Sequence, residues 1–71
     1  TLRELRKRRG LTQSEVNSRL RVSRSTCSTW EVGEREPSLT NAVKLARLLG
    51  VSLKTLARSM QIDVDGVPDD E

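Results

Sequence analysis

The sequence predicts an all-α domain built from five short helices. Apolar residues recur at spacings of three and four residues, the pattern of one helix face, and Ser, Thr and Gly stand at the boundaries between these segments. No stretch alternates apolar and polar residues in the manner of a half-buried strand. Because the chain has 71 residues, we expect one folding unit with one modest core and no separate catalytic lobe.

The first helix is predicted over residues 1–9, where Leu2 and Leu5 stand three apart among basic side chains. Gly10 is expected to end this helix, because glycine readily adopts the left-handed conformation that closes many helices. Leu2 and Leu5 should therefore face the core.

The second helix is predicted over residues 13–20, directly after Thr12. Thr12 and Glu15 have the spacing of a capping box, in which each side chain binds the backbone N–H of the other residue. Val16 and Leu20 stand four apart and should form the buried face of this helix.

The third helix is predicted over residues 24–32, with Ser23 as its N-cap and Gly33 at its end. Cys27 and Trp30 should point inward, because they stand three apart on one face. The opposite face would then carry Arg24, Ser25, Ser28 and Thr29.

Two further helices are predicted after a polar loop. Ser38 is expected to cap the fourth helix, which Gly50 closes, and Ser52 is expected to cap the fifth. The inward stripe of the fourth helix comprises Leu39, Ala42, Val43, Ala46 and Leu49. The inward stripe of the fifth comprises Leu53, Leu56 and Met60.

Only residues 21–23 separate the second and third helices, so the chain turns sharply and the two helices cross steeply, as in a helix-turn-helix. The outer face of the third helix bears one Arg and several hydroxyl groups, with no acid before Glu31. Arg pairs bidentately with guanine, and Ser or Thr hydroxyls bond to any base edge. This face is a candidate for reading bases, although a short polar helix with good caps would have the same composition.

Charge is distributed unevenly along the chain. Residues 1–59 hold all 13 Lys and Arg side chains against five Glu, a net charge of +8, as expected of a polyanion binder. Similar charge also occurs on solvated helices of proteins that bind no polyanion. The acids after residue 60 are Asp63, Asp65, Asp69, Asp70 and Glu71. We therefore predict a domain over residues 1–60 and an acidic, flexible tail over residues 61–71.

The composition argues against several functional classes. The chain has no His and one Cys, so it lacks the commonest general base and metal ligand and cannot form an internal disulfide. We expect no enzymatic activity, no metal and no cofactor. No apolar run approaches the roughly 18 residues that a membrane span needs, and a single Cys fits a reducing compartment.

Four stretches of the sequence carry a family resemblance: LRELRKRRGLTQSEV, VSRST, TWEVGEREPSL and KLARLLGVSLKTL. In this order and spacing they make residues 2–56 resemble the Cro/C1-type (XRE-like, lambda-repressor-like) helix-turn-helix domains. The resemblance implies a compact five-helix lambda-repressor-like fold, with the helix-turn-helix formed by the second and third helices. It also implies binding to double-stranded DNA.

The resemblance indicates which residues meet the DNA. In the family the N-terminus of the second helix, here Gln13, holds a phosphate, and the backbone N–H groups of Gln13 and Ser14 agree with an anion site. The loop after the third helix follows the DNA backbone, so Arg35 is a phosphate candidate, although it could equally be a solvated loop charge. The expected phosphate contacts are Gln13, Ser14, Ser23 and Arg35. The expected base contacts are Arg24, Ser25, Ser28 and Thr29.

Two charged residues are expected to be structural. Arg6 and Glu31 correspond to a pair that links the first helix to the end of the third in family members, so the resemblance implies a partly buried ion pair here. The other basic residues of the first helix either touch phosphates or stay solvated. They are Arg3, Lys7, Arg8 and Arg9.

Three positions depart from the family's pattern. Asn17 stands where the family has a small residue, Arg21 where it has Gly, and Cys27 where it has Ile or Val. Asn17 would bring a polar amide to a close helix crossing, and Arg21 would have to adopt a left-handed conformation at about 1 kcal/mol or more. The large Trp30 is expected to refill the volume that Cys27 leaves. The departures leave the angle between the second and third helices open.

These observations predict a transcription regulator, specifically a repressor, that binds double-stranded DNA with its third helix in the major groove. One such helix reads about half a site, so we expect a homodimer on a palindromic operator. Candidate dimer contacts are Leu48, Met60, Ile62 and Val64. The expected location is cytoplasmic, on the nucleoid through DNA. The alternative is a protein-interaction adaptor or antitoxin-like module that keeps the fold without the DNA face.

Overall fold

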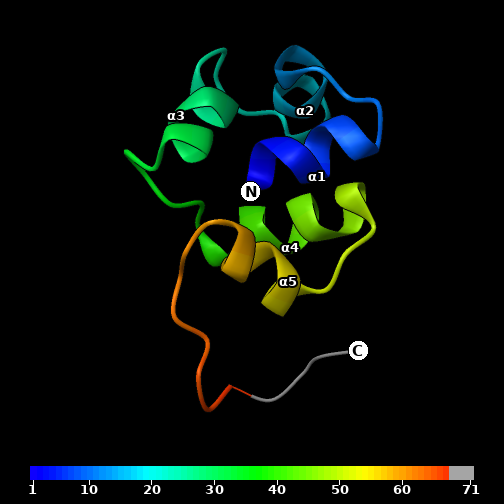
Figure 1. Ribbon diagram of the computed structural model, residues 1–71. Helices are drawn as coiled ribbons and strands as arrows, with labels where there is room; N and C mark the ends of the chain where they lie inside the picture. Colours follow the sequence, from blue (N-terminus) through cyan, green and yellow to red (C-terminus); the bar gives the residue numbers. More distant parts are fainter. Residues whose placement is uncertain (68–71) are drawn as a thin grey trace.

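The computed structural model describes residues 1–67 and has five helices and no strand over that range (Figure 1). The helices are α1 (Leu2–Arg8), α2 (Gln13–Leu20), α3 (Thr26–Val32), α4 (Leu39–Leu49) and α5 (Leu53–Ser59). The expected all-α, five-helix fold is confirmed. None of these helices is long and apolar enough to cross a membrane.

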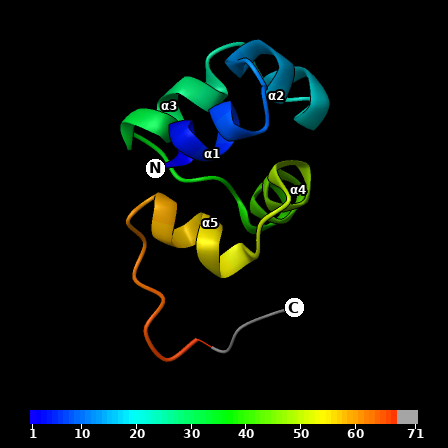
Figure 2. The ribbon, with the colours of Figure 1, turned by 45° about the vertical axis from the view of Figure 1, so that its right-hand side comes forward.

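The helices form two groups. α1, α2 and α3 lie together in one part of the molecule, and α4 and α5 lie below them in the view of Figure 2. α2 packs against both α3 and α4, and α1 packs against α3 and α5, so α1 and α2 connect the two groups. One core is therefore shared by all five helices.

Side-chain caps begin four of the five helices in the described range. The capping residues are Thr1, Thr12, Ser38 and Ser52, each of which accepts a hydrogen bond from the N–H three residues further on. The predicted caps of α2, α4 and α5 are confirmed. Gly33 and Gly50 end α3 and α4, as predicted, in the left-handed conformation.

The start of α3 corrects the prediction. α3 begins at Thr26 and not at Arg24, and the side chain of Ser25 at the N-cap position makes no capping hydrogen bond. Ser23 was expected to cap the helix, but its Oγ lies 2.6 Å from Oγ1 of Thr26. The N–H of Thr26 donates to the carbonyl of Ser23 at 3.1 Å, which closes a tight turn before the helix. Arg24 therefore lies in this turn, where it is exposed.

Within residues 1–67, the core consists of ten buried apolar side chains. They are Leu2, Leu5, Val16, Leu20, Cys27, Trp30, Leu45, Ala46, Leu49 and Leu56. The inward residues predicted for α1, α2 and α3 are confirmed, but the stripe predicted for α4 was wrong at Leu39, which is 73% exposed, and omitted Leu45, which is 1% exposed. Leu39 is the first residue of α4, and it lines a hollow at the surface with Leu53 and Ala57 instead of entering the core.

The turn between α2 and α3 forms around Arg21. This residue closes α2 in the left-handed conformation, with φ 56° and ψ 44°, as predicted. The N–H of Val22 donates to the carbonyl of Asn17 at 3.0 Å, the bond that defines a Schellman motif. Because α2 and α3 also pack against each other, the predicted helix-turn-helix is present.

Residues 60–67 leave α5 as an irregular segment that extends below the helices in the view of Figure 1. Ile62 and Val64 are half-buried. Nζ of Lys54 donates to the carbonyl of Val67 at 3.1 Å. The rest of the predicted acidic tail, residues 68–71, lies outside the described residues.

Candidate nucleic-acid interface

The predicted base-reading residues lie at the start and on the outer side of α3. Arg24 and Ser25 are exposed, and Ser28 and Thr29 are half-buried. The hydroxyl of Ser28 donates to the carbonyl of Ser25 at 2.8 Å, and that of Thr29 donates to the carbonyl of Thr26 at 2.7 Å. Each hydroxyl thus uses its one proton within the helix and offers lone pairs to a ligand. Such lone pairs can accept from the amino groups of adenine and cytosine, while Arg24 supplies donors for guanine.

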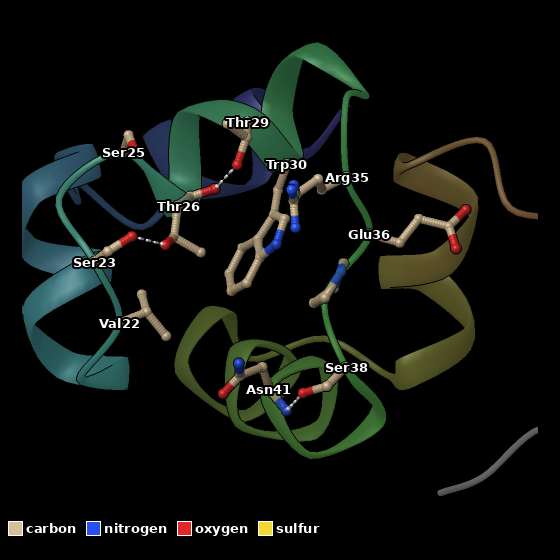
Figure 3. Close-up of a pocket in the computed structure, with 11 residues that line it drawn as sticks. Val22, Ser23, Ser25, Thr26, Thr29, Trp30, Arg35, Glu36, Ser38 and Asn41 are labelled. Carbon is tan, nitrogen blue, oxygen red and sulfur yellow. Dashed lines mark hydrogen bonds between the residues drawn. The ribbon is translucent and has the colours of Figure 1, made fainter.

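A polar hollow of about 530 Å³ runs along one flank of α3 (Figure 3). Two predicted base contacts, Ser25 and Thr29, and two predicted phosphate contacts, Ser23 and Arg35, line it. The indole of Trp30 projects from α3 toward α4 within this region. The structure therefore brings these four polar residues together although Ser23 and Arg35 are far apart in sequence.

A second hollow, of about 630 Å³, lies where the other flank of α3 meets α1 and α2. Gln13 and Ser28 line it together with the exposed Arg3. Ser14 is not among its lining residues and instead lies beside Arg21 on another side of α2. Six of the eight predicted DNA contacts thus fall into two groups that flank α3, whereas Arg24 and Ser14 line neither hollow.

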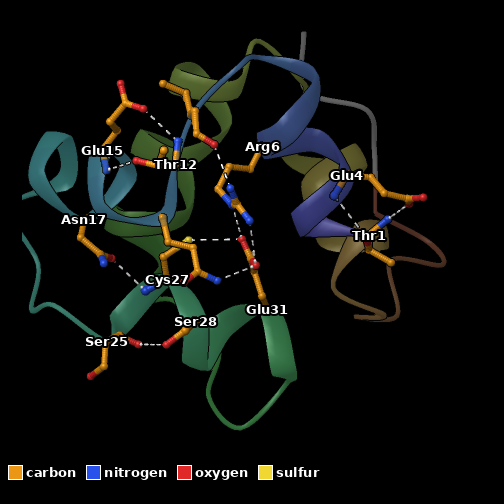
Figure 4. A network of polar contacts seen from close by, with 12 residues as sticks. Thr1, Glu4, Arg6, Thr12, Glu15, Asn17, Ser25, Cys27, Ser28 and Glu31 are labelled. Carbon is orange, nitrogen blue, oxygen red and sulfur yellow. Dashed lines mark hydrogen bonds and ion pairs between the residues drawn. The ribbon is translucent and has the colours of Figure 1, made fainter.

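Arg6 and Glu31 form a buried ion pair between α1 and α3 (Figure 4). Nε of Arg6 donates to Oε2 of Glu31 at 2.6 Å and Nη2 donates to Oε1 at 3.3 Å, and the two side chains are 9% and 6% exposed. Nη1 of Arg6 donates to the carbonyl of Leu11 at 2.8 Å. The pair therefore fastens the end of α3 to α1 and to the loop before α2.

Both members of this pair are held in their charged forms. Burial by itself would raise the pKa of Glu31, but hydrogen bonds from Arg6, Gln13 and Cys27 outweigh it and hold that pKa below its ordinary value. The hydrogen bond to Glu31 raises the pKa of Arg6. Because Glu31 is the one acid in α3 and is neutralised on the inner side, the outer face of α3 presents no carboxylate to a DNA backbone.

Gln13 has a contact that the sequence did not predict. Its Nε2 donates to Oε1 of Glu31 at 2.9 Å. An amide nitrogen carries two hydrogens, so this bond orients the amide while the second N–H can reach another acceptor. The predicted phosphate donor is thus joined to the Arg6–Glu31 pair.

Two departures from the family's pattern take part in hydrogen bonds. The thiol of Cys27 donates to Oε2 of Glu31 at 3.4 Å, and burial raises its pKa to about 12, so it is an unreactive thiol at neutral pH. The side chain of Asn17 donates to the carbonyl of Arg24 at 2.8 Å and accepts from the N–H of Cys27 at 2.9 Å. The partners of Asn17 lie seven and ten residues further on, so no local sequence pattern marks these contacts.

The chain is similar in sequence to known helix-turn-helix proteins. The helix-turn-helix family model matches residues 2–56. The chain is 33% identical over 64 residues to the cryptic phage CTXphi transcriptional repressor RstR of Vibrio cholerae, covering 90% of this chain and 58% of the repressor. It is 47% identical over 49 residues to an HTH-type transcriptional regulator of Methanothermobacter thermautotrophicus, covering 69% of this chain and 71% of that protein.

A third relative is the HTH-type transcriptional regulator y4dJ of Sinorhizobium fredii, which is 44% identical over 48 residues, covering 68% of this chain and 62% of that protein. The chain thus spans less than two thirds of the length of two of these three relatives. The family match runs from α1 into α5 and includes the whole helix-turn-helix. The chain belongs to the Cro/C1-type helix-turn-helix family of DNA-binding transcription regulators.

Proposed function

We propose that this chain binds double-stranded DNA in a sequence-specific manner, with α3 in the major groove. The observation that carries the proposal is the composition of the outer side of α3. Arg24 supplies donors, and Ser25, Ser28 and Thr29 supply hydroxyl oxygens. The only acid of the helix, Glu31, forms an ion pair with Arg6 inside the domain. A face with donors, acceptors and no free carboxylate suits base edges between two phosphate backbones.

The two hollows beside α3 support this docking mode. A helix in the major groove has one phosphate backbone on each side, and α3 has one polar hollow on each flank. In our proposal Ser23 and Arg35 contact one backbone and Gln13 contacts the other. Ser14 contributes through its backbone N–H at the N-terminus of α2, where the helix dipole favours an anion.

We further propose that the chain acts as a repressor and as a homodimer on a palindromic operator, on the nucleoid in the cytoplasm. RstR, a relative that covers most of the chain, is named as a transcriptional repressor. A single α3 spans only about half an operator, and related motifs bind two half-sites about one helical turn apart. Among the dimer contacts that the sequence suggested, Leu48 and Met60 pack against the core. Ile62 and Val64 line an apolar hollow near α4 and α5 and are better placed.

A protein-interaction module is the second candidate function. The apolar hollow that favours it holds about 390 Å³ and includes Leu39, which is 73% exposed, and Val67, which is 49% exposed. Apolar side chains gathered at a hollow of this kind mark many protein contact sites. An adaptor or antitoxin-like protein would use this hollow and would have no need of the polar face of α3.

Selection of bound duplexes from a random DNA pool separates the two functions. A sequence-specific reader should enrich one palindromic site, with half-sites about one helical turn apart if it binds as a symmetric dimer. An asymmetric enriched site would contradict the symmetric dimer but would still support sequence-specific binding. A pool that shows no enrichment after repeated rounds would contradict sequence-specific binding and favour the adaptor.

A further inference from the structure

We propose that Asn17 is a positioning residue for base reading. From α2 it fixes the first turn of α3 and the backbone of Arg24, and thereby the point from which the Arg24 side chain reaches the DNA. The inference rests on the proposed function, because it assigns Asn17 an effect on sequence discrimination.

α3 takes its N-terminal cap from Asn17. Within residues 1–67, α3 is the one helix whose own N-cap side chain makes no capping hydrogen bond. Oδ1 of Asn17 accepts from the N–H of Cys27, the second residue of α3, at 2.9 Å (Figure 4). An N-cap Ser, Thr or Asn normally makes this contact from the helix's own start. The side chain that caps the N-terminus of α3 therefore comes from α2.

The same side chain holds the backbone of Arg24. Nδ2 of Asn17 donates to the carbonyl oxygen of Arg24 at 2.8 Å. The backbone hydrogen bonds of α3 begin one residue later, where the N–H of Thr29 donates to the carbonyl of Ser25 at 3.1 Å. Arg24 thus precedes the hydrogen-bonded helix, and Asn17 gives its carbonyl a fixed partner.

Asn17 also holds the other end of the turn. Its main-chain carbonyl accepts from the N–H of Val22 at 3.0 Å. One residue therefore closes α2 through its backbone and begins α3 through its side chain. Asn17 is 5% exposed and Cys27 is 1% exposed, so water cannot easily replace the amide, and its loss leaves the N–H of Cys27 buried without its acceptor while the main-chain bond to Val22 remains.

This placement affects discrimination because bidentate pairing tolerates little displacement. A side chain that binds a ligand by two hydrogen bonds must be held to roughly 0.5 Å by its support. Phosphate contacts are more tolerant, because they depend mainly on charge. Loss of the Asn17 amide should therefore reduce the preference for the correct base more than it reduces binding to any duplex.

The test compares Asn17→Ala with Ser18→Ala, a matched change at an exposed neighbour on the same helix. The measured quantity is the ratio of Kd for a scrambled duplex to Kd for the selected site. Asn17→Ala should lower this ratio about tenfold, with little change for the scrambled duplex, and should abolish hydrogen-exchange protection of the Cys27 amide. Ser18→Ala should change neither quantity.

A double-mutant cycle with Arg24→Ala tests whether Asn17 acts through Arg24. Asn17→Ala should lower the ratio when Arg24 is present and have almost no effect in the Arg24→Ala background. If Asn17 were purely structural, Asn17→Ala would lower the melting temperature in both backgrounds. Its effect on the Kd ratio would then not depend on whether Arg24 is present. Asn17→Asp keeps the acceptor for Cys27 and, as a carboxylate, removes the donor to Arg24, so it should lose discrimination even though the capping hydrogen bond to α3 is kept.

Three results would overturn the inference. The first is that Asn17→Ala retains the Kd ratio of the wild-type chain. The second is that the effect of Asn17→Ala on this ratio is as large in the Arg24→Ala background. The third applies if Asn17→Ala fails to fold, and is that Asn17→Asp keeps full discrimination. A wild-type chain that prefers no sequence is a different result. It would be seen before any variant is made, and it would overturn the proposed function and this inference with it.

Discussion

Replacement of Arg6 by Ala is expected to destabilise the domain strongly. The guanidinium makes two hydrogen bonds to Glu31, at 2.6 and 3.3 Å, and one to the carbonyl of Leu11, at 2.8 Å. The two charged side chains are only 9% and 6% exposed. Removal of one partner from a buried pair costs about 3–5 kcal/mol, because the other charge is left buried without compensation. Gln13 still donates to Glu31 in the variant, so we expect the lower end of this range.

The assay is thermal unfolding followed by circular dichroism. In a domain of this size each kcal/mol lowers Tm by about 4–8 °C, so Arg6→Ala should lower Tm by on the order of 15 °C. Glu4→Gln is the control, because Glu4 pairs with the backbone nitrogen of Thr1 at the surface, where the side chains are 69% and 71% exposed. Exposed ion pairs contribute little to the free energy of unfolding. If Arg6→Ala melted within a few degrees of the wild-type chain, or no lower than Glu4→Gln, the buried pair would not be a main support of the fold.

Acid should destabilise the domain through Glu31. Its pKa in the folded chain is held below the ordinary value of 4.5, so its contribution is complete above that pH and is lost as the pH falls through the folded pKa. Urea unfolding at a series of pH values should show a flatter dependence for Glu31→Gln, and parallel curves would count against this assignment. Arg21→Gly should raise Tm by several degrees, because Arg21 has φ 56° and a left-handed side-chain residue costs about 1 kcal/mol; a lower Tm would refute the expected relief of strain. Ending the chain at Val67 removes Asp69, Asp70 and Glu71 and should tighten binding to random duplex DNA at low salt only. Equal affinity of the two chains at low salt would show that these acids do not compete with DNA.

The helix caps that the sequence pattern predicted depend on short-range contacts, whereas the Arg6–Glu31 pair, which joins residues 25 positions apart, was implied by the family resemblance. The caps at Thr12, Ser38 and Ser52 bind N–H groups three residues away, so the spacing of residue types is enough to identify them. The left-handed Arg21 was predicted from the family resemblance, because Arg21 stands where the family has Gly.

The errors arise where a tertiary contact decides. Ser23 is of a residue type that is common at N-caps. The capping acceptor comes instead from Asn17 in another helix, and α3 begins at Thr26. Leu39 fits the spacing of the buried stripe but lies at the edge of the layer, and Leu45 takes its place in the core. Periodicity identifies a face, but the neighbouring helices determine how far along the helix that face is covered.

The candidate site shows the same division. The inward position of Cys27 and Trp30, which spacing predicts, leaves Ser28 and Thr29 toward the outer side of α3, whereas Arg24 and Ser25 are exposed because they lie before the helix begins. The link from Gln13 to Glu31 joins residues 18 positions apart, and only the fold brings them together.

The central claim is that the outer face of α3 reads bases while its flanks hold phosphates. Binding of Arg24→Ala and Arg35→Ala to the selected site and to scrambled DNA, each measured over a series of salt concentrations, tests it most directly. Arg24→Ala should lose about 1–3 kcal/mol on the selected site, relax the preference at one base pair and bind scrambled DNA nearly as before. Arg35→Ala should weaken binding to both duplexes alike and reduce the salt slope by about one. If Arg24→Ala lost affinity equally for every sequence, Arg24 would be a phosphate contact, and the assignment of base reading to it would be wrong.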